Sequence, residues 1–345
     1  MTEKIKVLIV DDSALIRQML KEVFASLNDV EVVGTAADPF IARDKIKRLN
    51  PDVLTLDVEM PRMNGLQFLG NLMRLRPMPV VMVSTLTEAG APETLEALET
   101  GAVDYIAKPK AKDEVEFREF AESLSEKVRM AAKARVRPYT PGQKKTAPAL
   151  AKVQYKRMVC IGSSTGGTEA IRELLEDVPE NCPPIVITQH IPEVFSASFA
   201  MRLNRSLAME VLEAEDGLEV RPGRVIIAKG NKHLTFKKQG AQIVCQLIDT
   251  ERVNRHKPAV EVMFDAIAEV TPANKLVAVM LTGMGADGAQ AMKRLKDAGA
   301  NCLAQDESTS VVWGMPKAAY DLGAVDEVVS LPNIASKMLK AAQLP

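Results

Sequence analysis

The sequence predicts two α/β domains, each a doubly wound, mostly parallel β-sheet with helices on both faces. Length is the first indication, because 345 residues suit two domains of roughly 150 residues each. The second is a rhythm of short apolar runs and helical stretches that occurs on both sides of a segment rich in proline and basic residues. That rhythm is typical of parallel strands joined by crossover helices.

The first half shows this rhythm five times. β-branched runs predict strands at residues 6–10, 30–36, 51–57, 79–84 and 104–108. Amphipathic stretches between them, such as residues 14–27 and 64–75, predict helices. We therefore expect a five-stranded, flavodoxin-like sheet.

A connecting segment follows. Residues 131–152 contain three prolines and six Lys or Arg but few large apolar side chains, which is typical of an extended, solvated linker. We assign residues 1–125 to the first domain, 126–152 to the linker and 153–345 to the second domain.

The second half resumes the same rhythm. We expect strands within residues 157–163, 183–190, 224–230, 275–281 and 301–305, and a helix at residues 168–178. In open α/β sheets, reactive groups gather beyond the carboxyl ends of the strands, so these ends are the places to search for chemistry.

Composition excludes several classes of protein. The formal net charge of -1 predicts no general affinity for nucleic acid or anionic lipid. No apolar run approaches the roughly 18 residues that span a bilayer, and no signal peptide opens the chain, so we expect a cytoplasmic protein without membrane insertion. The four cysteines form no CxxC pair, and we expect reduced core residues.

Acidic residues end two strands of the first domain. Asp11 and Asp12 follow one strand and Asp57 ends another; if these strands are neighbours, the three carboxylates converge. Clustered carboxylates favour a hard divalent cation such as Mg²⁺. Lys108 follows the fifth strand and Ser84 ends the fourth, where both can reach the same place. An acid before a helix can also be a simple N-cap, but the combination of five positions favours a site.

With these motifs, residues 1 to about 125 resemble a response-regulator receiver domain. The resemblance implies that a histidine kinase phosphorylates Asp57, and that Mg²⁺ is held by Asp11, Asp12, Asp57 and the backbone carbonyl of Glu59. It also implies that Lys108 pairs with the phosphoryl oxygens, that Ser84 moves to bond them, and that Tyr105 changes rotamer.

A serine lies in a glycine-rich turn of the second domain. Gly162, Ser164 and Gly166 fit G-x-S-x-G, the pattern of a sharp strand-to-helix turn that exposes a serine hydroxyl. The helix that follows would direct backbone NH groups, such as that of Thr165, toward an oxyanion. Alone, the segment fits a phosphate-binding loop or an ordinary turn equally well.

The remaining partners favour a nucleophile. The chain has three histidines, and His190 ends the next strand, where it could serve as a base. Asp287 follows a third apolar strand and could orient that histidine, although it could also cap a helix. His256 and His233 remain competitors for the role of base, and His256 could instead touch substrate.

The segments at residues 161–171, 187–192 and 280–292 resemble the catalytic domain of the CheB family, the chemotaxis protein-glutamate methylesterases. The resemblance implies Ser164 as nucleophile, His190 as base, Asp287 as orienting acid and an oxyanion NH from Met284 in addition to Thr165. It implies methyl-ester hydrolysis on chemoreceptors, deamidation of certain glutamines, and no cofactor for either reaction. Phosphorylation of the receiver is expected to activate the enzyme by uncovering the serine.

Two rival hypotheses come from other classes of protein. A receiver could regulate a nucleic-acid-binding module, but the second half lacks a helix-turn-helix rhythm and a basic recognition surface. The glycine-rich turn could bind a nucleotide, but neither of the two common phosphate-loop patterns is present.

Overall fold

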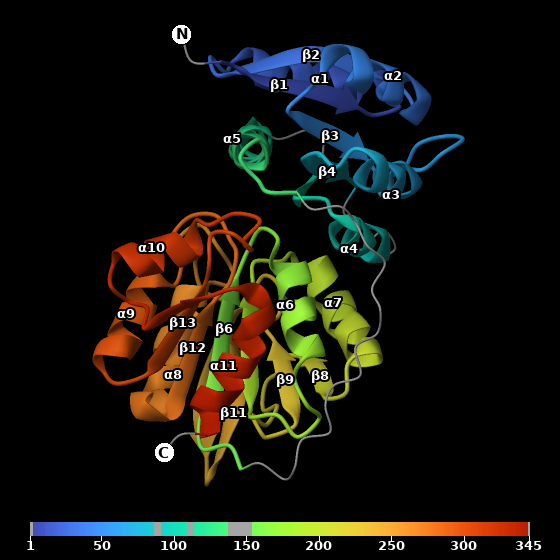
Figure 1. The fold of residues 1–345 in the computed structure, drawn as a ribbon. Helices are drawn as coiled ribbons and strands as arrows, with labels where there is room; N and C mark the ends of the chain where they lie inside the picture. The colour runs from blue at the N-terminus through green and yellow to red at the C-terminus, as the bar shows by residue number, and fades with distance from the viewer. Residues whose placement is uncertain (1–2, 86–90, 110–113, 137–153, 344–345) are drawn as a thin grey trace. The chain divides into compact units, whose positions relative to one another are not determined.

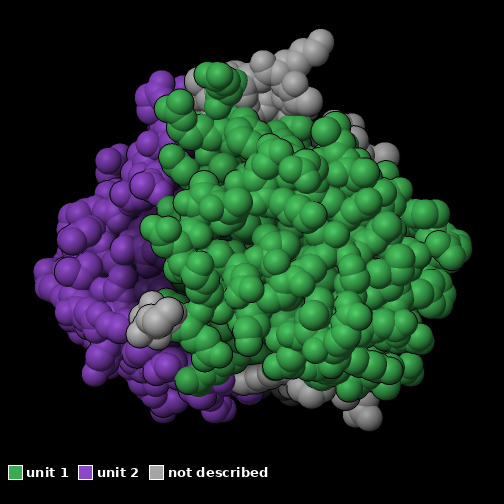
Figure 2. All heavy atoms as spheres, turned by 90° about the horizontal axis from the view of Figure 1, so that it is seen from above, with its two compact units in different colours: residues 1–142 green, residues 143–345 purple. Residues whose placement is uncertain are grey.

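The computed structural model describes residues 3–85, 91–109, 114–136 and 154–343, and it divides into two compact units, residues 1–142 and 143–345 (Figures 1 and 2). Much of the predicted linker lies outside the described residues. Helix α5 ends at Ala131, beyond the predicted end of the first domain at residue 125. The domain boundaries themselves stay a prediction.

The first unit is a five-stranded parallel sheet. Its strand order is β2-β1-β3-β4-β5, so the first and third strands are neighbours, as the convergence of the acids requires. The elements are β1 (Ile5–Val10), α1 (Ala14–Ala25), β2 (Val30–Ala36), α2 (Pro39–Leu49), β3 (Val53–Asp57), α3 (Gly65–Leu75), β4 (Val80–Ser84), α4 (Ala91–Thr100), β5 (Asp104–Ala107) and α5 (Glu114–Ala131).

Side-chain caps fix where the first helices begin. Ser13 caps α1, Asp38 caps α2 and Asn64 caps α3, and each side chain accepts a hydrogen bond from a backbone NH in the first turn. Strand β3 is buried along its whole length, as expected for a central strand covered on both faces. The loops after β1 and β3 therefore leave the same edge of the sheet.

The second unit is built on a seven-stranded parallel sheet of order β14-β13-β12-β6-β7-β9-β8. Its elements are β6 (Met158–Ser163), α6 (Gly167–Glu176), β7 (Ile185–Gln189), α7 (Glu193–Ser206), β8 (Glu210–Glu213), β9 (Arg224–Ile227), β10 (His233–Gln239), β11 (Gln242–Ile248), α8 (Val260–Val270), η1 (Ala273–Lys275), β12 (Leu276–Met280), α9 (Ala289–Asp297), β13 (Asn301–Gln305), α10 (Met315–Asp321), β14 (Glu327–Val329) and α11 (Leu331–Gln343).

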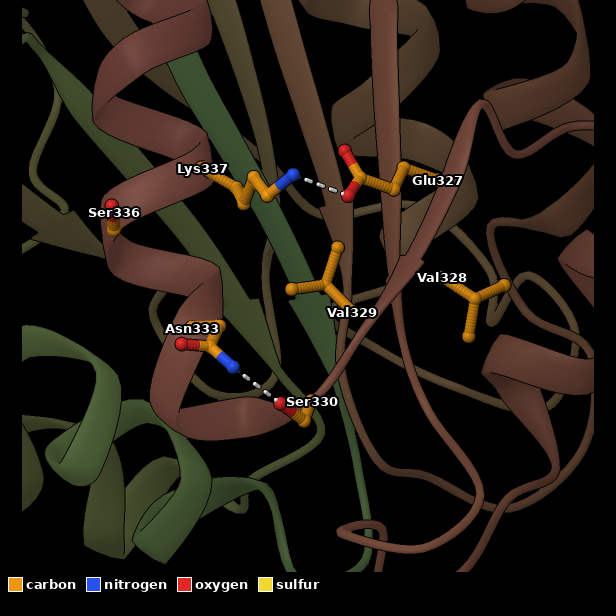
Figure 3. A pocket seen from close by; sticks show the side chains of 7 residues that line it. All are labelled: Glu327, Val328, Val329, Ser330, Asn333, Ser336 and Lys337. Atoms are coloured by element: carbon orange, nitrogen blue, oxygen red, sulfur yellow. Dashed lines mark hydrogen bonds and ion pairs between the residues drawn. The ribbon is translucent and has the colours of Figure 1, made fainter.

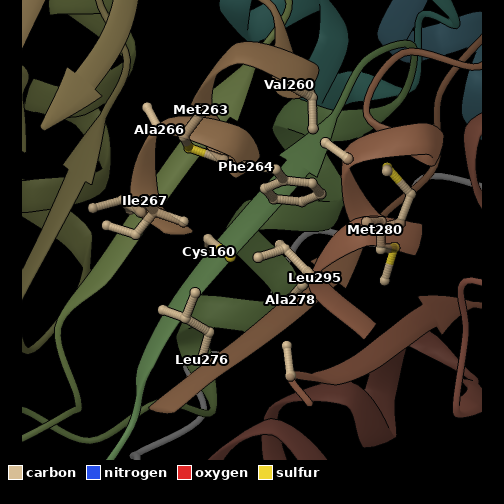
Figure 4. Close-up of a cluster of buried hydrophobic side chains, with 14 of the residues drawn as sticks. Cys160, Val260, Met263, Phe264, Ala266, Ile267, Leu276, Ala278, Met280 and Leu295 are labelled. Atoms are coloured by element: carbon tan, nitrogen blue, oxygen red, sulfur yellow. The ribbon is translucent and has the colours of Figure 1, made fainter. Parts of the chain in front are cut away.

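The core of this unit lies around the central strands. Cys160 of β6 and Ala278 of β12 pack with Phe264 and Ile267 of helix α8 (Figure 4). The strand neighbours of Cys160 are also fully buried, so β6 has protein on both faces. The two doubly wound domains are thus confirmed, whereas the antiparallel hairpin β10–β11 was not predicted.

The predicted core position of the four cysteines is also confirmed, because all four are buried. Among the described residues, no helix combines the length and the apolar character needed to cross a membrane.

Candidate functional site

The acids of the first unit converge at the ends of β1 and β3. Oxygen atoms of Asp11, Asp12 and Asp57 all lie within 4.8 Å of one another. The Lys108 ammonium lies 2.9 Å from a carboxylate oxygen of Asp11 and 2.9 Å from one of Asp57. Three close carboxylates with a single cation between them suit a hard divalent ion with oxygen ligands, so the residues present fit Mg²⁺.

Burial and charge alter the titration of this cluster. Burial raises the pKa of the Asp57 carboxyl to about 6, although Lys108 opposes the rise and the Asp11 charge adds to it. Burial lowers the pKa of the Lys108 ammonium, but its bonds to Asp57 and Asp11 outweigh this and the net shift is upward. The surroundings thus disfavour the ionised form of the Asp57 carboxyl and favour the charged form of the Lys108 ammonium.

The other residues predicted for this site lie on or next to the neighbouring strands β3, β4 and β5. The amide of Glu59 donates to Asp57 Oδ1 at 3.4 Å, and Ser84 is buried at the end of β4. Tyr105 is half-buried on β5, and burial raises the pKa of its hydroxyl. Sequence reasoning missed Arg17, whose guanidinium donates to the backbone carbonyls of Asp11, at 2.7 Å, and of Asp12, at 2.8 Å.

In the second unit, adjacent strands carry the serine and the histidine. Residue 163 of β6 pairs with residue 189 of β7, and the next residues along the two chains are Ser164 and His190. The His190 amide donates to the carbonyl of Ser163 at 3.1 Å, and the Ser164 amide donates to that of Thr282 at 3.0 Å. Three strand ends therefore meet at the serine.

His190 and Asp287 form a direct hydrogen bond. His190 Nε2 lies 2.8 Å from Asp287 Oδ2, and both side chains are buried. His190 Nδ1 is also buried and has no hydrogen-bond partner within the part of the chain that the structure describes. With a carboxylate on Nε2, the neutral ring carries its proton there, which leaves Nδ1 as the free basic nitrogen.

Asp287 is also a helix cap, but not of the helix that follows it. Its carboxylate accepts from the amides of Val260, at 2.6 Å, and Glu261, at 3.3 Å, at the start of α8. Asn254 donates to its Oδ1 at 2.8 Å. Burial raises the pKa of Asp287, but the bonds from His190, Asn254 and Val260 outweigh it and the net shift is downward.

The structure separates the two competing histidines. The ring of His256 stacks on that of His190 with centroids 3.5 Å apart and planes 9° apart, so it lies beside the predicted base. His233 is fully buried at the start of β10, where its Nδ1 accepts from the Ala259 amide at 3.2 Å. His233 thus has a structural partner, while His256 belongs to the site.

The predicted oxyanion donors lie on two loops. A Cβ placed on Gly283 would come within 2.9 Å of Ser164 Cβ, so the chain just before Met284 touches the serine. The Met284 amide donates to no acceptor among the residues that the structure describes. Thr165 is buried, and its carbonyl accepts from the Thr282 hydroxyl at 3.0 Å.

A separate pocket of about 300 Å³ lies between β14 and the start of α11 (Figure 3). Its lining includes Glu327 and Lys337, which form an ion pair at 2.6 Å, and none of the predicted site residues. The strand ends, and not this pocket, collect the reactive side chains.

Sequence reasoning missed Asn254 and gave no role to Gln189, which bonds the backbone of both Ser164 and His190. Asn254 lies in a turn between β11 and α8, and nothing in its local sequence points to Asp287. Gln189 had a signal, since a polar side chain stood at the end of an apolar strand beside the candidate base.

Comparison with known proteins agrees with this geometry. Residues 159–338 match the model of the CheB methylesterase family, and residues 7–118 match that of the response regulator receiver domain. A protein-glutamate methylesterase/protein-glutamine glutaminase 2 of Xanthomonas oryzae is 53% identical over 97% of this chain and 96% of its own length. A protein-glutamate methylesterase/protein-glutamine glutaminase of Nitrosomonas europaea is 51% identical over 98% and 96%.

Among solved structures, the CheB methylesterase catalytic domain of Thermotoga maritima aligns with a TM-score of 0.52 and 40% identity, covering 53% of this chain and 97% of that one. The matches favour the esterase hypothesis over the nucleic-acid and nucleotide alternatives. The chain therefore belongs to the CheB methylesterase family, with a response regulator receiver domain in front of the esterase domain.

Proposed function

We propose that this chain hydrolyses γ-methyl esters of glutamate side chains on chemotaxis receptors, and deamidates certain glutamines there, through Ser164, His190 and Asp287. The observation that carries the proposal is the hydrogen bond of 2.8 Å between His190 and Asp287, a buried residue that caps helix α8. His190 and Ser164 directly follow two adjacent strands. A histidine held this way is the arrangement that activates a serine for acyl transfer.

The reaction begins when His190 Nδ1 takes the Ser164 proton and Oγ bonds to the γ-carbonyl carbon. We assign to the backbone amides of Met284 and Thr165 the role of donors to the resulting oxyanion. Collapse breaks the carbon–oxygen bond to methanol, which leaves with the proton from His190. Water then adds with the same base, releases the glutamate and restores Ser164; a glutamine releases ammonia instead.

Asp287 stabilises the charged histidine while it holds the proton. Its depressed pKa keeps the carboxylate ionised, and the amides at the start of α8 hold it in place. Asp287 thereby selects the tautomer that leaves Nδ1 free.

We further propose that a chemotaxis histidine kinase phosphorylates Asp57 and that this activates the esterase. Asp11, Asp12, Asp57 and the Glu59 carbonyl would hold Mg²⁺, which neutralises charge on the transferred phosphoryl group. Lys108 would pair with the phosphoryl oxygens, and Ser84 and Tyr105 would respond to them. We place this chain in the cytoplasm, and we propose no nucleic-acid partner and no insertion into the membrane.

The test is methanol release from methylated chemoreceptor membranes by the purified chain, with and without a small-molecule phosphodonor. Ser164→Ala provides the blank. Release that needs Ser164 and rises with phosphodonor supports both halves of the proposal. Release without stimulation leaves the esterase and refutes the switch, whereas no release in either condition refutes the assigned reaction.

A further inference from the structure

The side chain of Gln189 donates hydrogen bonds to the main chain of both the proposed nucleophile and the proposed base. Gln189 is the last residue of β7, and it is buried. Its amide nitrogen donates to the backbone carbonyl of Ser164 at 2.9 Å and to that of His190 at 3.2 Å. Its amide oxygen accepts from the hydroxyl of Ser163 at 2.6 Å.

These hydrogen bonds lie where the pairing between strands β6 and β7 ends. The pairing of β6 with β7 ends at Ser163 and Gln189, and the last backbone bond between them runs from the His190 amide to the Ser163 carbonyl. Beyond this bond, the segment after β6 leads into α6 and the segment after β7 leads toward α7. The Gln189 amide therefore links the two segments at Ser164 and His190, one residue past the end of the strand pairing.

The orientation of this amide is fixed by its surroundings. If it were reversed, its oxygen would face the two carbonyl oxygens of Ser164 and His190, and neither of those two bonds would form. The glycine at position 167 leaves space for the amide oxygen. A Cβ at that position would lie 2.1 Å from Gln189 Oε1. A buried amide with both ends satisfied is a rigid link.

We propose that Gln189 is a positioning residue that sets the separation of Ser164 and His190, and so the approach of the serine hydroxyl to the basic nitrogen. The inference rests on the roles proposed above for those two residues. Displacement of reacting groups by about 1 Å can cost on the order of 100-fold in rate, so a link at this point controls the rate without touching substrate.

The decisive variant is Gln189→Met, which keeps the length of the side chain and removes all three hydrogen bonds. We expect kcat for methanol release to fall about 10- to 100-fold with KM little changed, because ester binding does not involve this buried side chain. Ser163→Ala, which removes only the bond that orients the amide, should fall by a smaller factor.

A second readout separates positioning from folding. A fluorophosphonate that labels the reactive serine gives the number of competent sites and the labelling rate of each. We expect Gln189→Met to keep the full number of sites and to label slowly. The control is Thr271→Val, which removes a buried hydroxyl whose partner, Met158, lies at the opposite end of β6; it should label at the wild-type rate.

Fewer sites that label at the normal rate would show a role in stability only and overturn the proposal. If Gln189→Met does not fold, Ser163→Ala decides, and a wild-type labelling rate in that variant also overturns it. Labelling of Ser164 in a wild-type chain that releases no methanol would refute the proposed substrate, yet the comparison of labelling rates would still test Gln189. Absence of labelling at Ser164 would refute both.

Discussion

Replacement of Asp287 by asparagine tests the proposed triad most directly, because the change preserves shape and removes charge. All four groups around the carboxylate are donors: His190 and the Val260 amide at Oδ2, and Asn254 and the Glu261 amide at Oδ1. An asparagine NH₂ at either position would face two donors. The variant therefore loses two hydrogen bonds unless the histidine changes tautomer.

The magnitude follows from those two outcomes. Each bond to a charged group contributes roughly 1.5–3 kcal/mol, so loss of two costs about 3 kcal/mol at the lower end. If His190 instead gives up its Nε2 proton to accept from the amide, Nδ1 becomes protonated and cannot take the Ser164 proton. A wrong tautomer of this kind lowers kcat by about 10⁴-fold in a serine protease, or about 5.4 kcal/mol at 1.36 kcal/mol per tenfold.

We therefore expect Asp287→Asn to release methanol about 10²- to 10⁴-fold more slowly than the wild type. The matched control is Asp265→Asn on α8, which removes an exposed carboxylate paired with Arg294 at 2.7 Å and should keep full activity. A folded Asp287→Asn variant that retains more than about a tenth of the wild-type rate would refute the assignment of Asp287.

Stability gives an independent check with a defined sign. Because the pKa of Asp287 is lowered from 3.8 in the folded chain, its charge stabilises the fold above that pH, and this contribution is lost as the pH falls through the folded value. The deficit of Asp287→Asn in urea unfolding should shrink as the pH falls below about 4. A deficit that grows as the pH falls below about 4 would contradict the reasoning.

Three further predictions follow from other parts of the molecule. Mg²⁺ should raise the melting temperature of the receiver transition in calorimetry, and Asp12→Ala and Asp57→Asn should each reduce that shift; an unchanged shift in both variants would place the ion elsewhere. His256→Ala should lower kcat about tenfold because it uncovers one face of the His190 ring, whereas His256→Phe should restore most of the rate; loss of about 10³-fold or more in both variants would instead make His256 the base. A thiol reagent should not modify the native chain, since all four cysteines are buried, and should find four thiols after denaturation; rapid reaction of the folded chain would contradict the burial.

The sequence predicted those parts of the site that depend on strand ends. In a parallel sheet the carboxyl ends of the strands share one edge, so Ser164, His190 and Asp287 could be expected at the same edge before the strand order β12-β6-β7 was known. The same rule placed Asp57 beside Asp11. Periodicity and turn residues are local signals, and a parallel sheet turns them into long-range contacts.

The contacts made by the chain between β11 and α8 could not be predicted in this way. Asn254 and Arg255 form a tight turn with positive φ at both residues. Asparagine is common at the first of these positions, but Arg255 stands where glycine is the usual choice, so the turn signal was incomplete. The turn brings Asn254 to Asp287 and His256 to His190. Similarly, an aspartate before a helix suggested a cap of α9, whereas the packing of α8 against this loop made Asp287 a cap of α8.

The nitrogen that Asp287 occupies determines how far the base can reach. Nδ1 is separated from the main chain by only two carbon atoms, whereas Nε2 lies at the far side of the ring. A base that reacts through its near nitrogen can take a proton only from a nucleophile close to the main chain, such as a serine that follows the adjoining strand. The acyl group must therefore approach the edge of the sheet closely. The enzyme should accordingly accept esters at the tip of a slender, flexible side chain and discriminate against acyl groups branched next to the carbonyl.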